Sequence, residues 1–280
     1  MSKFLSSVAM TEFDSQVKHA YQGSGKLKNL VELRTNVTGD TYKFRLMGQG
    51  QGHERTGSSS LVVPMDVNHS LITATLTNHE HPEYTDIFDQ AEVNFDEKAK
   101  LAETIGLAMG RTMDQLIIDQ LIAGNYNATD TDGQGKAIAA GGTGFTTAKL
   151  RELRAYCDDL EMEKEQTILV SGTGMESLLA NTETTSADFA TVKALVNGEL
   201  NTFMGFNFVK IGARRLEGGL GGSGLDAYMF HMPAVGLAVG LNEQTSVDWV
   251  PERTSWLCNG ILKAGAAIID PEGTAKIEFV

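Results

Sequence analysis

The sequence predicts an α+β protein built around one unusually long helix. Between Phe95 and Ala123 the chain has no proline, and apolar residues recur at the spacing of one helix face. At 1.5 Å per residue this helix would be roughly 40 Å long, several times the usual three turns. Alternating runs before the helix and apolar runs after it predict strands. The helix is expected to be a strut across which other layers lie, although the pattern fits the core helix of an α+β enzyme equally well.

The predicted helix, residues 95–123, carries signals at both ends and two glycines inside. Asn94 is expected as the N-cap, with Glu97 three residues further on, and Gly124 as a left-handed stop. Gly106 and Gly110 lie one turn apart, and each costs about 1 kcal/mol of helix stability relative to alanine. Glycines at these positions indicate a bend or another backbone packed closely against the helix.

The composition suits one large domain or two small ones, with ample apolar residues for a core. No run approaches the roughly 20 apolar residues that cross a membrane, and the N-terminus lacks a signal segment. We therefore expect a soluble, cytoplasmic protein without membrane contact. The two cysteines, Cys157 and Cys258, fit no metal-ligand spacing and are predicted to be buried thiols.

The net charge of −13 is unevenly distributed along the chain. Residues 1–55 contain eight Lys and Arg against five acids, whereas residues 56–280 contain 15 against 31. A basic arm on an acidic body is typical of nucleic-acid contact, or of an arm that lies on a neighbour's acidic surface. Because phosphate repels an acidic body, sequence-specific DNA binding is disfavoured, and the self-complementary interpretation fits better.

The first 78 residues are predicted to form an arm and a long loop. Residues 1–22 contain a short amphipathic helix, and the Gly-Ser-Gly-Lys that ends at Lys26 lacks the spacing of a phosphate loop. Runs at 31–34 and 42–46 are predicted as strands joined by a turn at Gly39 and Asp40, and strand-like sequence resumes at 61–67 and 71–76. The stretch Gly48–Ser60 has no large apolar side chain and must project or be disordered. Because an isolated hairpin is marginal in water, this arm needs a surface to lie on, either its own domain or another subunit.

Two segments resemble metal sites only in part. His79 and His81 lie two residues apart in the acidic stretch 79–97, but no third ligand follows at suitable spacing, so a solvated or intersubunit charged face is the default. The segment 130–135 resembles part of a calcium loop, yet Ala128 and Ala139 occupy its first and twelfth ligand positions. No metal site is predicted.

The second half alternates predicted helices with predicted strands. The helices are 146–160 and 174–180, and the strands are 167–170, 203–211, 227–231, 235–241 and several within 245–279. Gly219, Gly221 and Gly224 match a dinucleotide fingerprint in spacing, but a strand follows where a helix is required. Ser171 lacks the flanking glycines of a nucleophile elbow, and His231 fits a core or interface histidine. We predict no catalytic residue and no cofactor.

Three segments carry a family resemblance: Pro82–Glu97 (PEYTDIFDQAEVNFDE), Ser186–Gly198 (SADFATVKALVNG) and Val250–Trp256 (VPERTSW). They resemble the major capsid proteins of tailed bacteriophages, which have the Hong Kong 97-type capsid fold. The order of parts agrees over nearly the whole chain: N-terminal arm 1–29, extended loop 30–78, peripheral domain 79–144 with spine helix 95–123, axial domain 145–240, and peripheral return strands 241–280.

The resemblance implies assembly rather than catalysis. Pentamers and hexamers would form an icosahedral head around double-stranded DNA, assembled in the bacterial cytoplasm, with the extended loop lying across a neighbour. Some relatives cross-link a loop lysine to a neighbour's asparagine, but Gly48–Ser60 contains no lysine, so no covalent link is expected. A separate scaffolding protein and a portal are the other expected partners, with a cement protein as a further candidate, and the packaged DNA is contacted non-specifically.

Two alternatives stay open from the sequence alone. A cytoplasmic α+β enzyme would use residues 48–60 as a mobile lid over a polar pocket. An encapsulin-type nanocompartment would enclose an enzyme cargo instead of DNA. For the capsid interpretation, two sets of residues are predicted to make the intersubunit contacts. Basic residues of the arm and loop, together with residues next to them in sequence, are expected to contact an acidic surface of another subunit. The first set is Lys26, Lys28, Lys43, Arg45, His53, Glu54 and Arg55, and the second is Glu83, Asp86, Asp89 and Glu92.

Overall fold

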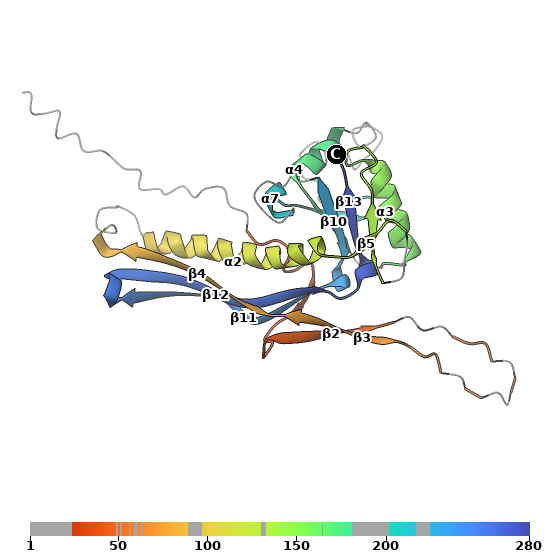
Figure 1. Ribbon diagram of the computed structural model, residues 1–280, viewed down its shortest axis with the longest axis horizontal. Coiled ribbons are helices and arrows are strands. Elements are labelled where there is room, and N and C mark those ends of the chain that lie inside the picture. The colour runs from red at the N-terminus through yellow and green to blue at the C-terminus, as the bar shows by residue number, and fades with distance from the viewer. Residues whose placement is uncertain are drawn as a thin grey trace, which may run out of the picture.

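The computed structural model describes residues 24–280 except 49, 51, 56, 59–60, 63, 89–96, 130–132, 164, 181–201 and 217–224. The protein is elongated, with a long sheet and helix on one side, a second sheet standing on it, and a thin arm projecting beyond both (Figure 1). No helix in the described part of the chain is both long and apolar enough to cross a membrane. The predicted helix within residues 1–22 lies outside the described residues.

The first sheet has the strand order β1-β11-β12-β4. Its strands are β1 (Glu32–Arg34), β11 (Val235–Val250), β12 (Ser255–Ile268) and β4 (Thr77–Asp86). The antiparallel pair β11 and β12 forms its long centre, β4 is antiparallel to β12, and β1 is parallel to β11. The predicted hairpin between 31–34 and 42–46 is wrong. Val31 is buried in the core under the long helix, so β1 joins this sheet instead.

The long helix α2 (Glu97–Ile122) lies along the first sheet (Figure 1). Its apolar face is buried as the spacing predicts, through Ile105, Met109, Met113, Ile117, Ile118 and Leu121. The expected N-cap, Asn94, lies outside the described residues. The predicted left-handed stop is wrong, because Gly124 is not among the residues with positive φ. A Cβ there would lie 2.7 Å from the Tyr126 hydroxyl oxygen, so glycine makes room for a ring whose hydroxyl donates to the Leu121 carbonyl.

The second sheet has the order β5-β6-β13-β10-β7-β9-β8 and its own core. The strands are β5 (Tyr126–Asn127), β6 (Gly135–Ile138), β13 (Thr274–Glu278), β10 (Asp226–His231), β7 (Gln166–Val170), β9 (Phe206–Lys210) and β8 (Thr202–Phe203). The helices α3 (Thr147–Asp159) and α4 (Gly172–Ala180) pack in this core, whereas α7 (Ala213–Leu216) packs against α2 and buries Leu216 in the core under that helix. Short 3-10 turns are η2 (Met232–Ala234), η3 (Pro251–Arg253) and η4 (Pro271–Gly273).

A buried lysine ties the second sheet to α3. The Lys149 ammonium donates to the carbonyls of Ala140, Thr143 and Glu278 at 2.9, 3.0 and 2.8 Å. Burial lowers the pKa of Lys149, although the charges of Glu152 and Glu278 oppose that effect. Because three carbonyl oxygens converge on one cation, this contact holds the C-terminal strand against the helix.

The arm consists of β2 (Thr41–Met47) and β3 (His69–Thr75), which pair with each other and with no other strand of the described residues. A small core formed by Phe44, Ala74, Leu76, Ala238, Ala267 and Ile269 fixes its root to the first sheet. The rest projects away from the body (Figure 1). The predicted strand 61–67 is wrong: the described residues there lie outside any strand, and Asp66 has a left-handed φ of 51° that interrupts one.

Candidate assembly surfaces

The arm presents cations on the outer face of β2. Lys43 and Arg45 are exposed, whereas Phe44 between them is buried at the root. This alternation follows from the period of two in a strand. In the loop beyond, His53, Glu54 and Arg55 are all exposed. The Arg55 guanidinium donates to the carbonyls of Gly57 and Ser58 at 3.0 and 2.7 Å, so it also shapes the loop.

The same arm carries an exposed apolar patch that our sequence reasoning missed. Leu61 and Val62 are 92% and 95% exposed, and Met47, Met65 and Leu71 are also exposed. Scattered apolar side chains are normal on a surface, but several on one projecting loop indicate a surface that another molecule covers. The signal was present in the sequence as the apolar run directly after the polar tip.

The predicted acidic surface lies on β4, at one edge of the first sheet. Glu83 is exposed and Asp86 is half-buried, with one Asp86 carboxylate oxygen accepting from the Phe88 amide at 2.8 Å. Asp89 and Glu92 lie outside the described residues. The Arg253 guanidinium stacks 4.5 Å from the centre of the Tyr84 ring beside this surface, so a cation already belongs to it.

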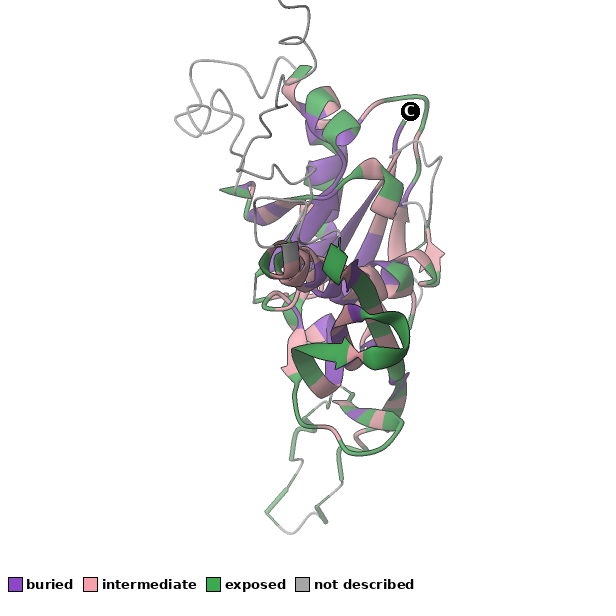
Figure 2. Cartoon of the chain, turned by 90° about the vertical axis from the view of Figure 1, so that its left-hand side faces the viewer, coloured by how far each residue is buried: buried purple, intermediate pink, exposed green. Residues whose placement is uncertain are grey.

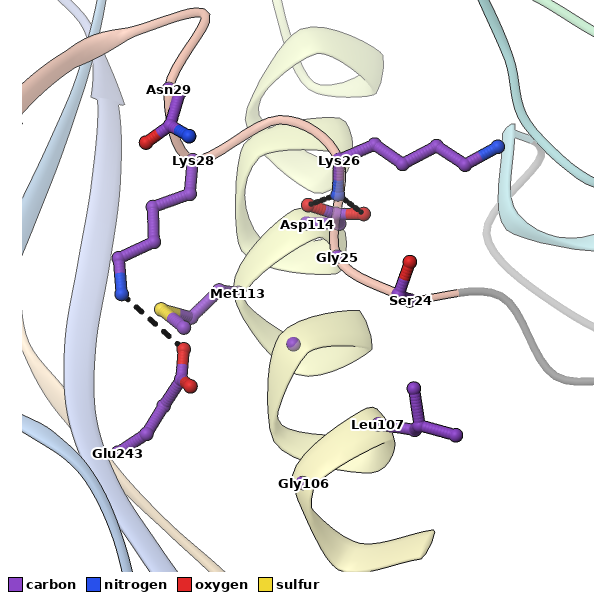
Figure 3. Close-up of a pocket in the computed structure, with 11 residues that line it drawn as sticks. Ser24, Gly25, Lys26, Lys28, Asn29, Gly106, Leu107, Met113, Asp114 and Glu243 are labelled. Atoms are coloured by element: carbon purple, nitrogen blue, oxygen red, sulfur yellow. Dashed lines mark hydrogen bonds and ion pairs between the residues drawn. The ribbon is translucent and has the colours of Figure 1, made fainter. Parts of the chain in front are cut away.

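Lys26 and Lys28, also predicted as intersubunit cations, have partners within their own chain. The Lys28 ammonium lies 3.3 Å from a Glu243 carboxylate oxygen on β11, and the Lys26 ammonium donates to the Lys210 carbonyl at 3.2 Å. Figure 3 shows the segment 24–29 crossing α2 beside a cavity of about 240 Å³.

A buried carboxylate fixes this crossing. Asp114 of α2 is fully buried and accepts from the backbone amides of Lys26 (3.0 and 2.9 Å) and Leu27 (2.9 Å). The Arg215 guanidinium lies 3.4 Å from Oδ2 of Asp114. Sequence reasoning missed Asp114, because its partners are 87 and 88 residues away and leave no local pattern.

The two helix glycines behave differently at the crossing. A Cβ on Gly110 would lie 3.0 Å from the Gly25 amide nitrogen, so the prediction of a closely packed backbone is confirmed there. A Cβ on Gly106 would meet no atom of the described residues within 4 Å, so no described backbone packs closely there, and the alternative of a bend stays a prediction.

The residues weighed as chemical groups make structural contacts. His79 is hydrogen-bonded to Thr77 and His81 to Thr112, at 2.8 and 2.9 Å. Burial, and secondarily the neighbouring His81, lowers the pKa of His79. Within the described ranges no three His, Cys, Asp or Glu residues are grouped as a metal site. The Ser171 hydroxyl accepts from the Gly174 amide at 3.1 Å and so caps α4.

The described chain is elongated, with two sheets, a long helix and an arm whose loop projects beyond the body and exposes apolar side chains (Figure 1). The family model described as phage capsid protein matches residues 5–280. The chain therefore belongs to the phage capsid protein family. It is a major capsid protein, a structural component of the virion shell and not an enzyme.

Solved structures agree on the fold at low sequence identity. The capsid of Cyanophage P-SCSP1u is 15% identical with a TM-score of 0.76, and the match covers 100% of this chain and 95% of that one. The capsid of an empty GTA particle is 12% identical with a TM-score of 0.77, covering 100% and 98%. A chain in the structure of Mycobacterium phage Che8 is 13% identical with a TM-score of 0.72, and the match covers 96% of this chain and 97% of that one. No curated protein sequence matches. The predicted Hong Kong 97-type capsid fold of tailed-phage heads is confirmed, and self-assembly into a shell follows from it.

Proposed function

We propose that this chain forms pentamers and hexamers that close into the icosahedral head around the double-stranded DNA of a tailed phage. The observation that carries the proposal is the arm: its root has a small core, but its loop exposes Leu61 and Val62 almost completely. Burying such side chains stabilises by about 1.5–3 kcal/mol each, so a neighbour that covers them is favoured. In this proposal residues 145–240 are the axial domain around the symmetry axes, and 79–144 with 241–280 are the peripheral domain. Three strands of those outer segments, β5, β6 and β13, lie in the second sheet beside the strands of 145–240.

The arm's cations supply the second part of the proposal. Lys43 and Arg45 point outward from β2, and Glu83 and Asp86 lie on β4, so opposite charges face solvent on different parts of one chain. Contacts between different surfaces of identical copies are heterologous, and they close into rings when the rotation allows it. Exposed ion pairs contribute at most about 1 kcal/mol, so they set orientation while apolar burial supplies affinity.

The loop sequence bears on how the proposed shell is held together. Since Gly48–Ser60 cannot supply an amine for a cross-link, the shell is held by burial and charge, and a cement protein is a candidate external support. A separate scaffolding protein and a portal complete the proposed assembly in the bacterial cytoplasm. The acidic body contacts the packaged DNA non-specifically and weakly.

Electron microscopy of the purified protein tests the proposal, because a capsid subunit forms closed particles tens of nanometres across. An encapsulin-type shell would enclose protein cargo, so nuclease-protected double-stranded DNA in particles from infected cells separates the two. A charge swap tests the contact: Arg45→Glu should reduce particle yield, and adding Glu83→Arg should restore it. Arg151→Glu, at an exposed position of α3, is the matched control. If Arg45→Glu leaves the yield of closed particles unchanged, the pairing of Arg45 with Glu83 is contradicted, but the capsid function is not.

A further inference from the structure

Basic side chains gather where three segments far apart in the sequence meet beside α2. The segment 24–29 crosses α2, and the Lys26 ammonium reaches away from the helix to the end of β9, where it donates to the Lys210 carbonyl at 3.2 Å (Figure 3). The helix α7 follows β9 after a short turn, and the Arg215 guanidinium donates to the Arg111 carbonyl of α2 at 3.1 Å. We define the basic patch by Lys26, Arg111, Lys210, Arg214 and Arg215. It stands out on a chain whose net charge is −13.

Two acids lie beside the basic patch, and they do not cancel its charge. Asp114 is fully buried and lies 3.4 Å from the Arg215 guanidinium, so it neutralises a cation that is itself mostly covered. Asp119 is exposed on α2 and accepts from Gln115 at 2.7 Å. The exposed cations of the patch are Lys26, Lys210 and Arg214. Because they outnumber the exposed acid, the patch presents a positive potential to solvent.

The surface of the basic patch is polar. Among the described residues, large exposed apolar side chains lie in the arm, at the far end of the first sheet and at Met232 and Val280, and none lies in the three segments of the patch. Figure 2, which looks along α2, shows the near end of the first sheet largely exposed and the strands of the second sheet largely buried. Protein interfaces have an apolar, aromatic-rich centre, whereas nucleic-acid interfaces are more polar and more positive. The patch therefore fits a phosphate backbone better than a protein surface.

The two neighbouring arginines of α7 have different positions in the patch. The Arg215 guanidinium also lies 3.5 Å from the Gln115 side-chain oxygen, so it fixes α7 to α2. Arg214 is exposed beside it. A guanidinium presents a planar fork of donors that matches phosphate oxygens, and lysine ammonium groups add point charges. The fixed helix therefore presents Arg214 to phosphate between the two exposed lysines of the patch.

The patch and the root of the arm lie on opposite faces of the first sheet. The core that contains α2 covers one face, and the small core at the root of the arm covers the other (Figure 1). A ligand of the patch therefore approaches from the side of α2, away from the root of the arm.

We infer that the basic patch binds the phosphate backbone of double-stranded DNA and gives each acidic subunit one point of attachment to the packaged genome. The inference rests on the proposed function, because it requires the α2 side of the subunit to face the enclosed DNA. The binding is independent of sequence, since phosphate contacts carry no base information. Elsewhere the acidic surface repels phosphate, so the duplex is held at the patch and kept away from the rest of the subunit.

Binding of a short fluorescent duplex of mixed sequence to the unassembled full chain tests the inference, with anisotropy as the readout. If the three exposed cations each contact a phosphate, the affinity should fall about 40-fold between about 50 and about 200 mM salt. Arg214→Gln and Lys210→Gln each remove one contact, so the fall should shrink to about 12-fold in either variant. Arg151→Gln, at an exposed position of α3, and Arg45→Gln, on the arm, are the matched controls and should keep the full salt dependence.

Formaldehyde cross-linking of DNA-filled heads gives a second measurement, because it joins lysine amines to nearby DNA. Linked peptides that contain Lys26 or Lys210 support the inference, and links at Lys43 of the arm with none at the patch overturn it. A salt dependence that Arg45→Gln reduces and Arg214→Gln does not also overturns it.

Polyglutamate is the probe for an acidic protein partner. If Arg214→Gln weakens the binding of polyglutamate but not that of the duplex, the patch fits an acidic protein and the inference fails. The proposed function is tested separately, since it fails if the unmodified chain forms no closed particles on microscopy. Duplex binding that depends on Arg214 would still support the phosphate contact in that case.

Discussion

Removing the Asp114 carboxylate should unfasten the N-terminal segment from the spine helix. Asp114 accepts from the Lys26 and Leu27 amides, and hydrogen bonds to a charged group contribute about 1.5–3 kcal/mol each. Asp114→Ala loses both and leaves two backbone donors unsatisfied, so we expect the free energy of unfolding to fall by about 3–5 kcal/mol. The Arg215 ion pair adds little, because that guanidinium is partly solvated.

Urea-induced unfolding of the unassembled subunit, followed by tryptophan fluorescence, measures this loss. Asp119→Ala is the control: the same residue type lies on the same helix, but its side chain is exposed and, in the described part of the chain, accepts from Gln115 at 2.7 Å. Its effect should stay within about 0.5 kcal/mol. Trypsin should also cut after Lys26 faster in Asp114→Ala than in Asp119→Ala. Equal stability losses below about 1 kcal/mol in both variants would refute the idea that Asp114 anchors the segment.

Three further predictions use pairs of residues or a single thiol. Gly106→Ala should raise the unfolding free energy by about 0.5–1 kcal/mol, because its Cβ meets open space, whereas Gly110→Ala should lower it by about 1–3 kcal/mol, because its Cβ meets the Gly25 backbone. The midpoints of urea unfolding compare the two variants. If both variants were more stable than the unmodified chain, the close approach of residue 25 to α2 would be contradicted. Phe44→Ala should lower the unfolding free energy of the subunit by about 3–5 kcal/mol. Met47 is 67% exposed on the same strand, so Met47→Ala should leave that free energy unchanged and weaken only the assembled particles. Denaturation measures the first effect, and light scattering from particles measures the second. Burial raises the pKa of Cys157 to about 12, so at pH 8 about one thiol in 10⁴ is ionised and alkylation should await unfolding; prompt alkylation of the folded chain would count against this.

Features set by neighbouring residues were predictable from the sequence. The spine helix follows from a period of 3.6 that needs no knowledge of partners, and α2 covers most of the predicted span. The close approach at Gly110 was readable because glycine is costly inside a helix unless something requires it. The family resemblance supplied the order of parts, which composition alone did not.

Features set by distant partners were not predictable. β1 looks like one limb of a local hairpin, but its partner, β11, lies about 200 residues further along the chain. The role of Asp114 depends in the same way on amides far away in sequence. Exposure also has no local signature: the run at 61–67 has the composition of a strand, and only the fold shows that nothing in the described chain covers its apolar side chains.

The division between buried and exposed apolar surface explains why this chain assembles. One core lies among α2, the first sheet and part of the second sheet, another core belongs to the second sheet, and a third lies at the root of the arm. The loop of the arm has no such cover among the described residues, and it projects beyond the body (Figure 1). In the proposed shell a neighbour covers this loop, so the contact uses different surfaces on the two partners and each added copy exposes the same two surfaces again. Association of this kind stops only when a ring or shell closes, so in the proposed shell closure is the state in which every loop is covered.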